Sequence, residues 1–157
     1  MHAYLRLTVP TLLLPILLLL TFAFKARAEN QPLPEIMVYK SPTCGCCSKW
    51  VDHQRDNGFV VKTKDLRDMR MVKSIAGVKP EHASCHTAKV DGYVIEGHVP
   101  AADIKRLLKE RPAVTGLSVP GMPMGSPGME GPRSDPYEVL TFDEQGESRV
   151  FARHNQP

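Results

Sequence analysis

Three of the four cysteines of this chain lie within residues 44–47, in the stretch SPTCGCC. Before them, the apolar run EIMVYK at 35–40 predicts a buried strand. After them, the apolar spacing becomes helical, with Trp50 and Val51 on one face. The cysteines are therefore expected where a strand turns into a helix.

The chain continues as alternating strands and helices. After a helix stop at Asn57-Gly58, the pattern predicts a strand at 59–63 and a helix along Leu66, Met69, Val72 and Ile75 or Ala76. It then predicts a hairpin around Asp91-Gly92 and a helix after Pro100. This order of strand, helix, strand, helix, strand, strand and helix is typical of the α/β thioredoxin-like fold. We therefore expect a central sheet with helices on both faces.

From Pro112 to Pro136 the composition shifts to proline and glycine, without any period. Long loops of this kind are either functional or disordered. YEVLTF and SRVFAR, on either side of DEQG, then predict a terminal hairpin. We expect a thioredoxin-like domain at 29–111, followed at 112–157 by a Pro/Gly/Met-rich loop and a C-terminal β-hairpin extension packed on the same domain.

The N-terminus predicts a signal peptide. An apolar run from Leu7 to Phe24 precedes KARAEN, in which Ala26 and Ala28 fit the small-x-small cleavage pattern. We expect a signal peptide at 1–28 that is cleaved after Ala28, a periplasmic location and no stable membrane span after cleavage. An uncleaved N-terminal anchor is the alternative. The formal net charge of +3 comes from three basic residues in that segment, so the remainder is neutral and nothing indicates a nucleic-acid partner. A monomer is expected.

The cysteine cluster has two chemical interpretations. Cys44 and Cys47 form a C-x-x-C pair, which suits a redox disulfide, whereas Cys44, Cys46 and Cys47 together offer three sulfurs to a soft metal. Backbone N–H groups and the dipole at a helix start favour thiolates in either case. The metal interpretation uses all three cysteines, because adjacent sulfurs can each bind a different ion of a bridged cluster. A purely structural bridge is less useful, since it closes almost no loop.

The fourth cysteine, Cys85, lies in SCHT before the predicted hairpin. In a thioredoxin-like sheet this loop lies beside the first-loop cysteines, at the place where thioredoxins carry a cis-proline. The missing proline argues against general disulfide exchange and favours Cys85 as a fourth thiolate, although an inert buried cysteine is the alternative. His86 and His98 are candidate ligands, or else structural histidines. His53, His82 and His154 are predicted to be surface residues.

Methionines concentrate in the Pro/Gly loop, where core packing explains them less well than in a helix. They are Met122, Met124 and Met129. Thioether and thiolate ligands together select Cu(I), whereas zinc gains little from thioethers. The residues therefore favour copper, with simple packing of the methionines on the sheet as the alternative. An iron–sulfur cluster would also use four cysteines, but adjacent ligands and a methionine loop do not favour it.

Three stretches carry a family resemblance: SPTCGCCSKW, SCHTAKVDGYVIEGHVPAADIKRLL and GLSVPGMPMGSPGME. Together they resemble the CopG-like proteins of bacterial copper resistance, from about Ile36 to Phe151. The resemblance implies a periplasmic thioredoxin-like domain whose C-x-C-C cysteines hold a multi-copper, sulfur-bridged Cu(I)/Cu(II) cluster. It also implies interconversion of Cu(I) and Cu(II) before export, with a copper efflux system or a periplasmic copper carrier as partner.

Two rival functions remain. A periplasmic thiol–disulfide oxidoreductase would use Cys44 as the nucleophile and Cys47 as the resolving thiol. A passive structural or interaction module would hold its cysteines simply oxidised. Cys46→Ser separates the oxidoreductase from the copper hypothesis, because it would keep disulfide exchange but abolish metal binding. The passive module predicts instead that no metal copurifies with the protein.

Overall fold

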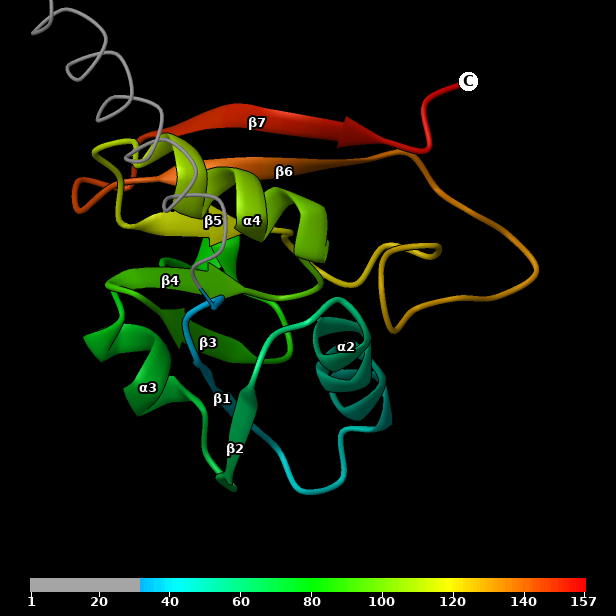
Figure 1. Ribbon diagram of the computed structural model, residues 1–157, viewed down its shortest axis with the longest axis horizontal. Coiled ribbons are helices and arrows are strands. Elements are labelled where there is room, and N and C mark those ends of the chain that lie inside the picture. Colours follow the sequence, from blue (N-terminus) through cyan, green and yellow to red (C-terminus); the bar gives the residue numbers. More distant parts are fainter. Residues whose placement is uncertain (1–31) are drawn as a thin grey trace, which may run out of the picture. The chain divides into compact units, whose positions relative to one another are not determined.

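The structure, a computed structural model, describes residues 32–157, so the predicted signal segment at 1–28 lies outside the described part. Within 32–157 the chain forms one sheet in the order β2-β1-β3-β4-β5-β6-β7 (Figure 1). The strands are β1 (Ile36–Lys40), β2 (Val61–Asp65), β3 (Thr87–Val90), β4 (Tyr93–Glu96), β5 (Gly116–Ser118), β6 (Tyr137–Phe142) and β7 (Ser148–His154). The helices are α2 (Gly45–Asp56), α3 (Arg70–Ile75), the short 3₁₀ helix η1 (Pro80–His82) and α4 (Ala101–Glu110).

The sheet is mixed, which confirms the α/β class. β1 pairs in parallel with β2 and antiparallel with β3, and β3 and β4 form the hairpin predicted at Asp91-Gly92. Both turn residues have positive φ, 46° at Asp91 and 88° at Gly92, as a two-residue hairpin turn requires. None of the helices between residues 32 and 157 is long and apolar enough to cross a membrane.

The main core lies between the sheet and two helices. Ile36 and Val38 lie on the same face of β1 and share this cluster with Trp50 of α2 and with Ile104 and Leu107 of α4. All five side chains are fully buried. A smaller cluster, formed by Ala76, Val78, Val94 and Phe142, lies apart from this core. Because neighbouring residues of a strand point to opposite faces, Val94 and Ile95 of β4 place these two clusters on opposite sides of the sheet.

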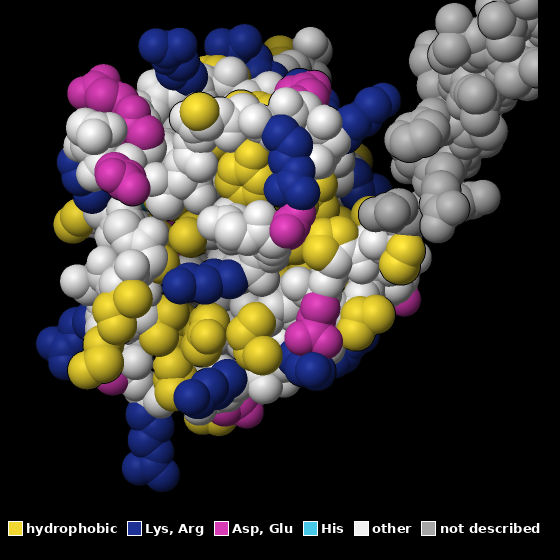
Figure 2. Space-filling view, turned by 60° about the vertical axis from the view of Figure 1, so that its left-hand side comes forward, with side chains coloured by type: hydrophobic (Ala, Val, Ile, Leu, Met, Phe, Trp, Pro, Cys, Tyr) yellow, Lys and Arg dark blue, Asp and Glu magenta, His cyan; other side chains and the backbone are white. Residues whose placement is uncertain are grey.

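The second predicted helix differs from its pattern. α3 is only six residues long and buries none of them, and Met71 and Ile75 are 72% and 73% exposed. The predicted helix is present but shorter than its pattern: Leu66, Met69 and Val72 are half-buried, and Ala76 rather than Ile75 is the buried residue at its end. In Figure 2, which brings the side of α3 to the front, exposed apolar side chains lie among lysines and arginines.

The C-terminal extension continues the same sheet. β5 falls inside the segment predicted to lack structure at 112–136, and it pairs in parallel with β4 and antiparallel with β6. A Cβ at Gly116 would lie 1.8 Å from the Val94 carbonyl oxygen, so glycine is required for this close approach. Three residues are too few to show a period, which is why the pattern missed β5.

Candidate metal centre

The first-loop cysteines lie at the start of α2, as the sequence predicts. Cys44 is the N-cap residue, and its Sγ accepts a hydrogen bond from the Cys47 backbone N–H at 3.3 Å. Cys44 and Cys47 are joined by a disulfide with their Cα atoms 5.3 Å apart, and the Cys47 side chain is fully buried. Cys46 is a half-buried free thiol, 3.4 Å from the Cys44 sulfur. This end of the helix therefore presents a C-x-x-C bridge and one spare thiol.

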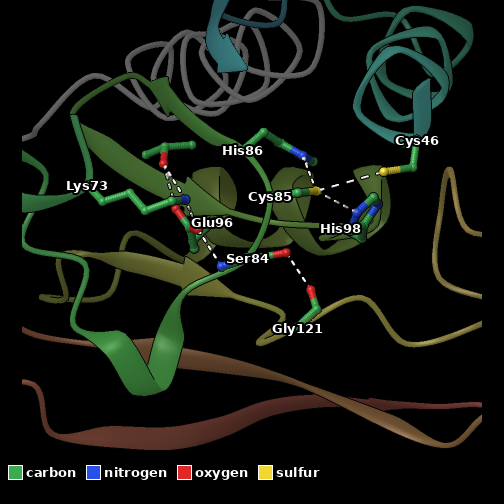
Figure 3. A network of polar contacts seen from close by, with 9 residues as sticks. Cys46, Lys73, Ser84, Cys85, His86, Glu96, His98 and Gly121 are labelled. Carbon is green, nitrogen blue, oxygen red and sulfur yellow. Dashed lines mark hydrogen bonds and ion pairs between the residues drawn. The ribbon is translucent and has the colours of Figure 1, made fainter. Parts of the chain in front are cut away.

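Cys85 lies in the loop between η1 and β3. Its Sγ lies 4.0 Å from the Sγ of Cys46, although the two residues are 39 positions apart in the chain. The four cysteine sulfurs lie within 4.8 Å of one another. The element order had predicted this meeting of the two loops, and Figure 3 shows Cys46 and Cys85 turned toward each other. The fold thus gathers a four-sulfur cluster at one helix end.

Two buried imidazoles flank Cys85. His98 Nε2 lies 3.0 Å from the Cys85 Sγ, and His86 Nδ1 lies 3.4 Å from the same sulfur (Figure 3). The other nitrogen of His98, Nδ1, lies 2.8 Å from the Pro127 carbonyl oxygen. A carbonyl oxygen only accepts, so Nδ1 must carry the proton and Nε2 has its lone pair toward Cys85. His98 is therefore held in the tautomer that a metal-binding histidine needs.

Burial sets the protonation of this cluster. Loss of solvent lowers the pKa of His98, and burial together with the nearby His98 lowers the pKa of His86 well below its ordinary value. Both rings are neutral, as ligands must be. Burial, followed by the neighbouring Cys46, raises the pKa of the Cys85 thiol to about 12. Without a cation the Cys85 thiol keeps its proton, which points to His98 Nε2.

A buried ion pair supports the loop that carries Cys85. The Glu96 side chain is fully buried at the end of β4 and pairs with Lys73 of α3. Its carboxylate also accepts hydrogen bonds from the Ser84 backbone N–H and the Thr87 hydroxyl, each at 2.7 Å (Figure 3). Ser84 and Thr87 lie on either side of Cys85 and His86, so Glu96 fixes this loop against the strand. Sequence reasoning missed this network, although a carboxylate in the otherwise apolar YVI run indicates a buried partner.

The Pro/Gly/Met loop approaches the cluster through its backbone. A Cβ at Gly128 would lie 2.6 Å from the Cys46 carbonyl oxygen, so the loop packs directly on α2. Pro127 supplies the carbonyl that binds His98. Met122 is 53% exposed, Met124 packs its methyl against Gly131, and Met129 is half-buried. The contacts that bring the loop to the site are thus made by Pro127 and Gly128, while the methionines remain candidate ligands.

The remaining histidines correct one expectation. His82 is 2% exposed and stacks on Phe142, so its prediction as a surface residue was wrong. His53 Nε2 accepts a hydrogen bond from the Ala101 N–H at the start of α4, and His154 pairs with Asp103 at 2.7 Å. Both are only partly exposed. The residues next to these histidines in the sequence do not indicate these contacts, because the partners are distant in the chain.

Known proteins resemble the chain over most of its length. Residues 82–129 match a family described as "Protein of unknown function, DUF411". The solved structure of copper resistance protein CopG, Form 2, has 47% identity and a TM-score of 0.74, and the match covers 79% of this chain and 99% of that one. Form 1 has 46% identity and a TM-score of 0.74, covering 80% and 100%. No curated protein matches the chain.

Proposed function

The chain belongs to the family of copper resistance protein CopG, and we propose that it binds several copper ions through the thiolates of Cys44, Cys46, Cys47 and Cys85. The observation that carries this proposal is the meeting of Cys46 and Cys85. Two loops 39 residues apart bring their sulfurs within 4.0 Å, beside a neutral imidazole 3.0 Å from Cys85. Soft thiolates next to a neutral imidazole nitrogen suit Cu(I) better than a hard ion.

The residues fit copper in charge as well as in type. His98 presents an unprotonated Nε2, and the Nε2 of His86 is buried without a hydrogen-bond partner among the described residues. A buried nitrogen without a partner is costly unless something binds it. His86 and His98 are therefore proposed as further ligands, and Met122, Met124 and Met129 as thioether ligands if the loop closes further.

Bound copper would supply one-electron redox chemistry. The chain's own part is to gather the thiolates, to hold His98 in one tautomer through the Pro127 carbonyl, and to pack the loop on α2 at Gly128. The thiolates of Cys44, Cys46, Cys47 and Cys85 would hold the copper ions and share their charge, so that a change between Cu(I) and Cu(II) would need little rearrangement of the chain. We propose interconversion of Cu(I) and Cu(II) as the role of this cluster in copper resistance.

The cellular setting is part of the same proposal. The strand order β2-β1-β3-β4, with β1 and β2 parallel and β3 antiparallel to β1, supports a thioredoxin-like domain at 29–111 with the extension at 112–157. The signal segment at 1–28 supports export to the periplasm. There a monomer would receive copper from a periplasmic carrier or pass it to a copper efflux system.

One observation favours a second candidate function. The Cys44–Cys47 disulfide is the bridge that a thiol–disulfide oxidoreductase would form. Cys47 is fully buried, as suits a resolving thiol, whereas the half-exposed Cys44 is open to attack. This alternative leaves Cys46, Cys85 and the neutral His98 without a task.

Metal analysis separates the two functions. The protein is expressed from the full-length chain, reduced, loaded anaerobically with Cu(I), freed of excess metal and assayed for copper and thiols. We expect more than one copper per chain, and most of it lost in Cys46→Ser. Absence of copper after loading, together with a Cys44–Cys47 bridge that exchanges equally well in Cys46→Ser, would replace copper binding by disulfide exchange.

A further inference from the structure

The disulfide divides the four-sulfur cluster into two pairs. Cys44 and Cys47 are bonded to each other, whereas Cys46 and Cys85 stay free. Each free thiol comes from a different segment, one from α2 and one from the loop before β3. A sulfur in a disulfide is no longer a thiolate and is a poor ligand for copper. Oxidation of the first pair therefore removes half of the thiolates and leaves the other half in place.

The pair that remains is spaced for one ion. Taking the ~2.3 Å of a zinc–thiolate bond as a guide, two sulfurs that share an ion lie at most ~4.6 Å apart. The Cys46 and Cys85 sulfurs lie 4.0 Å apart, within that limit. One ion can therefore join the two loops without a large backbone movement.

The third ligand for such an ion is already oriented. His98 Nε2 lies 3.0 Å from the Cys85 Sγ, with the proton of the ring on the opposite nitrogen, where it binds the Pro127 carbonyl. The Cys85 thiol proton occupies the place between sulfur and nitrogen that a cation would take. Replacement of that proton by a soft cation needs no change of the His98 tautomer.

We propose that the protein with the Cys44–Cys47 disulfide intact holds a single Cu(I) between Cys46, Cys85 and His98. This inference rests on the proposed function and adds its regulation: the redox state of one cysteine pair sets how much copper the site holds. Reduction takes two electrons and two protons and turns the disulfide into two thiols. A dithiol reductant supplies both and becomes a disulfide itself. The chain then gains two thiolates beside an ion that is already bound.

The test compares two forms of the same protein. The oxidised form is verified to have two free thiols and an intact Cys44–Cys47 bridge by alkylation and mass spectrometry, and the reduced form to have four thiols. Each is equilibrated anaerobically with Cu(I) against a competing chelator, and thiols are counted again afterwards. Ag(I), a soft ion that keeps its oxidation state, serves as a second probe. We expect one ion per oxidised chain and several per reduced chain.

Variants identify the ligands of the single ion. In the oxidised form, Cys85→Ser and His98→Gln are expected to weaken Cu(I) binding at least about tenfold. The double variant Cys44→Ser/Cys47→Ser cannot form the bridge. We expect it to bind one ion both with and without prior reduction. X-ray absorption of the loaded oxidised form should report sulfur and nitrogen neighbours.

The outcomes distinguish this inference from the proposed function. If the oxidised form binds neither Cu(I) nor Ag(I) while the reduced form binds several copper ions, the single-ion site is wrong and the copper function stands. If His98→Gln and Cys85→Ser leave the oxidised form's affinity unchanged, the ion binds elsewhere and the inference is equally wrong. If even the reduced form binds no copper, the proposed function itself fails.

Discussion

His98 faces Cys85 with an unprotonated nitrogen because its other nitrogen is tied to the Pro127 carbonyl, 2.8 Å away. The metal-binding end of the ring is thus set by a residue of the C-terminal extension. Hydrogen bonds of this kind, which orient a ligand from behind, typically change metal affinity by about 10- to 100-fold. The extension is therefore expected to contribute to copper binding even if none of its side chains touches the ion.

Two variants separate the thioethers from the rest of the loop, because a deletion removes both and leucine substitutions remove only the thioethers. Deletion of residues 120–131 removes both Pro127 and Gly128, and we expect it to lower Cu(I) affinity of the reduced protein more than about tenfold. The triple variant Met122→Leu, Met124→Leu and Met129→Leu keeps the volume of the side chains and removes only the thioethers. We expect a smaller loss for this variant, measured by competition with a Cu(I) chelator.

The comparison of the two loop variants needs a folding control and has two outcomes that would contradict our expectation. Far-ultraviolet circular dichroism of the deletion variant must retain the signal of the native sheet and helices for its affinity to be informative. An intact deletion variant with unchanged affinity would make the loop a bystander. A loss in the triple leucine variant as large as that of the deletion would make the thioethers the main contribution.

The buried pair of Lys73 and Glu96 is expected to act as a unit in stability. Glu96 is fully buried and Lys73 is 16% exposed, so removal of either partner leaves a charge that is largely cut off from water. We expect Lys73→Met and Glu96→Gln each to lower the free energy of unfolding by about 3 kcal/mol. Urea unfolding of both singles and of the double variant gives the coupling. Because the double variant leaves no unpaired charge, its loss should be less than the sum of the two.

The same variants report on the cluster. Glu96→Gln keeps an oxygen that accepts from the Ser84 N–H, whereas Glu96→Ala removes every contact between Glu96 and the loop. We expect Cu(I) affinity to fall in Glu96→Ala and to be largely retained in Glu96→Gln. Additive losses of stability for the Lys73 and Glu96 variants would contradict the coupling of the two residues. Equal Cu(I) affinities of Glu96→Ala and the native protein would show that Glu96 does not hold the Cys85 loop in its binding position.

His53 is expected to make the stability of the fold depend on pH. Burial lowers the pKa of His53 below its ordinary value of 6.5, and its Nε2 accepts the Ala101 N–H in the neutral form. The unfolded chain therefore binds this proton more readily than the folded one. The contribution of neutral His53 to the free energy of unfolding is fully present above pH 6.5. It is lost as the pH falls from there through the lower pKa of the folded state. His86 and His98, whose pKa values are also lowered, add to the same decline.

The contribution of His53 is isolated by substitution. Urea midpoints of copper-free protein are measured between pH 7.5 and 5 for the native chain and for His53→Gln, which keeps an amide oxygen as acceptor. We expect a shallower decline in His53→Gln. An identical slope in the two proteins would mean that His53 does not titrate between the folded and unfolded states.

Features with a local signature were predictable from the sequence. The change from the strand period to the helical period around residues 44–47 placed the cysteines at the start of α2, and Asp91-Gly92 placed the hairpin. The order of these elements was enough to bring Cys85 to Cys46. The thiolate chemistry of the site follows from residue type alone, which is why the cysteines were the firmest candidates.

Features that depend on distant partners were not predictable. The proton position on His98 depends on Pro127, which lies 29 residues away, and the burial of Glu96 depends on Lys73, 23 residues earlier. β5 is a strand only because β4 and β6 lie on its two sides. Neither a hydrophobic period nor a turn signal records such contacts. The sequence therefore indicates the candidate ligands but not the residues that hold them in place.

The two outer strands of the sheet, β2 and β7, both carry exposed basic side chains. β2 exposes Lys62 and Lys64, and β7 exposes Arg149 and Arg153. An outer strand has unpaired backbone groups that invite another strand, and lysine or arginine side chains discourage that addition. At high concentration these side chains should therefore disfavour the pairing of outer strands from different molecules.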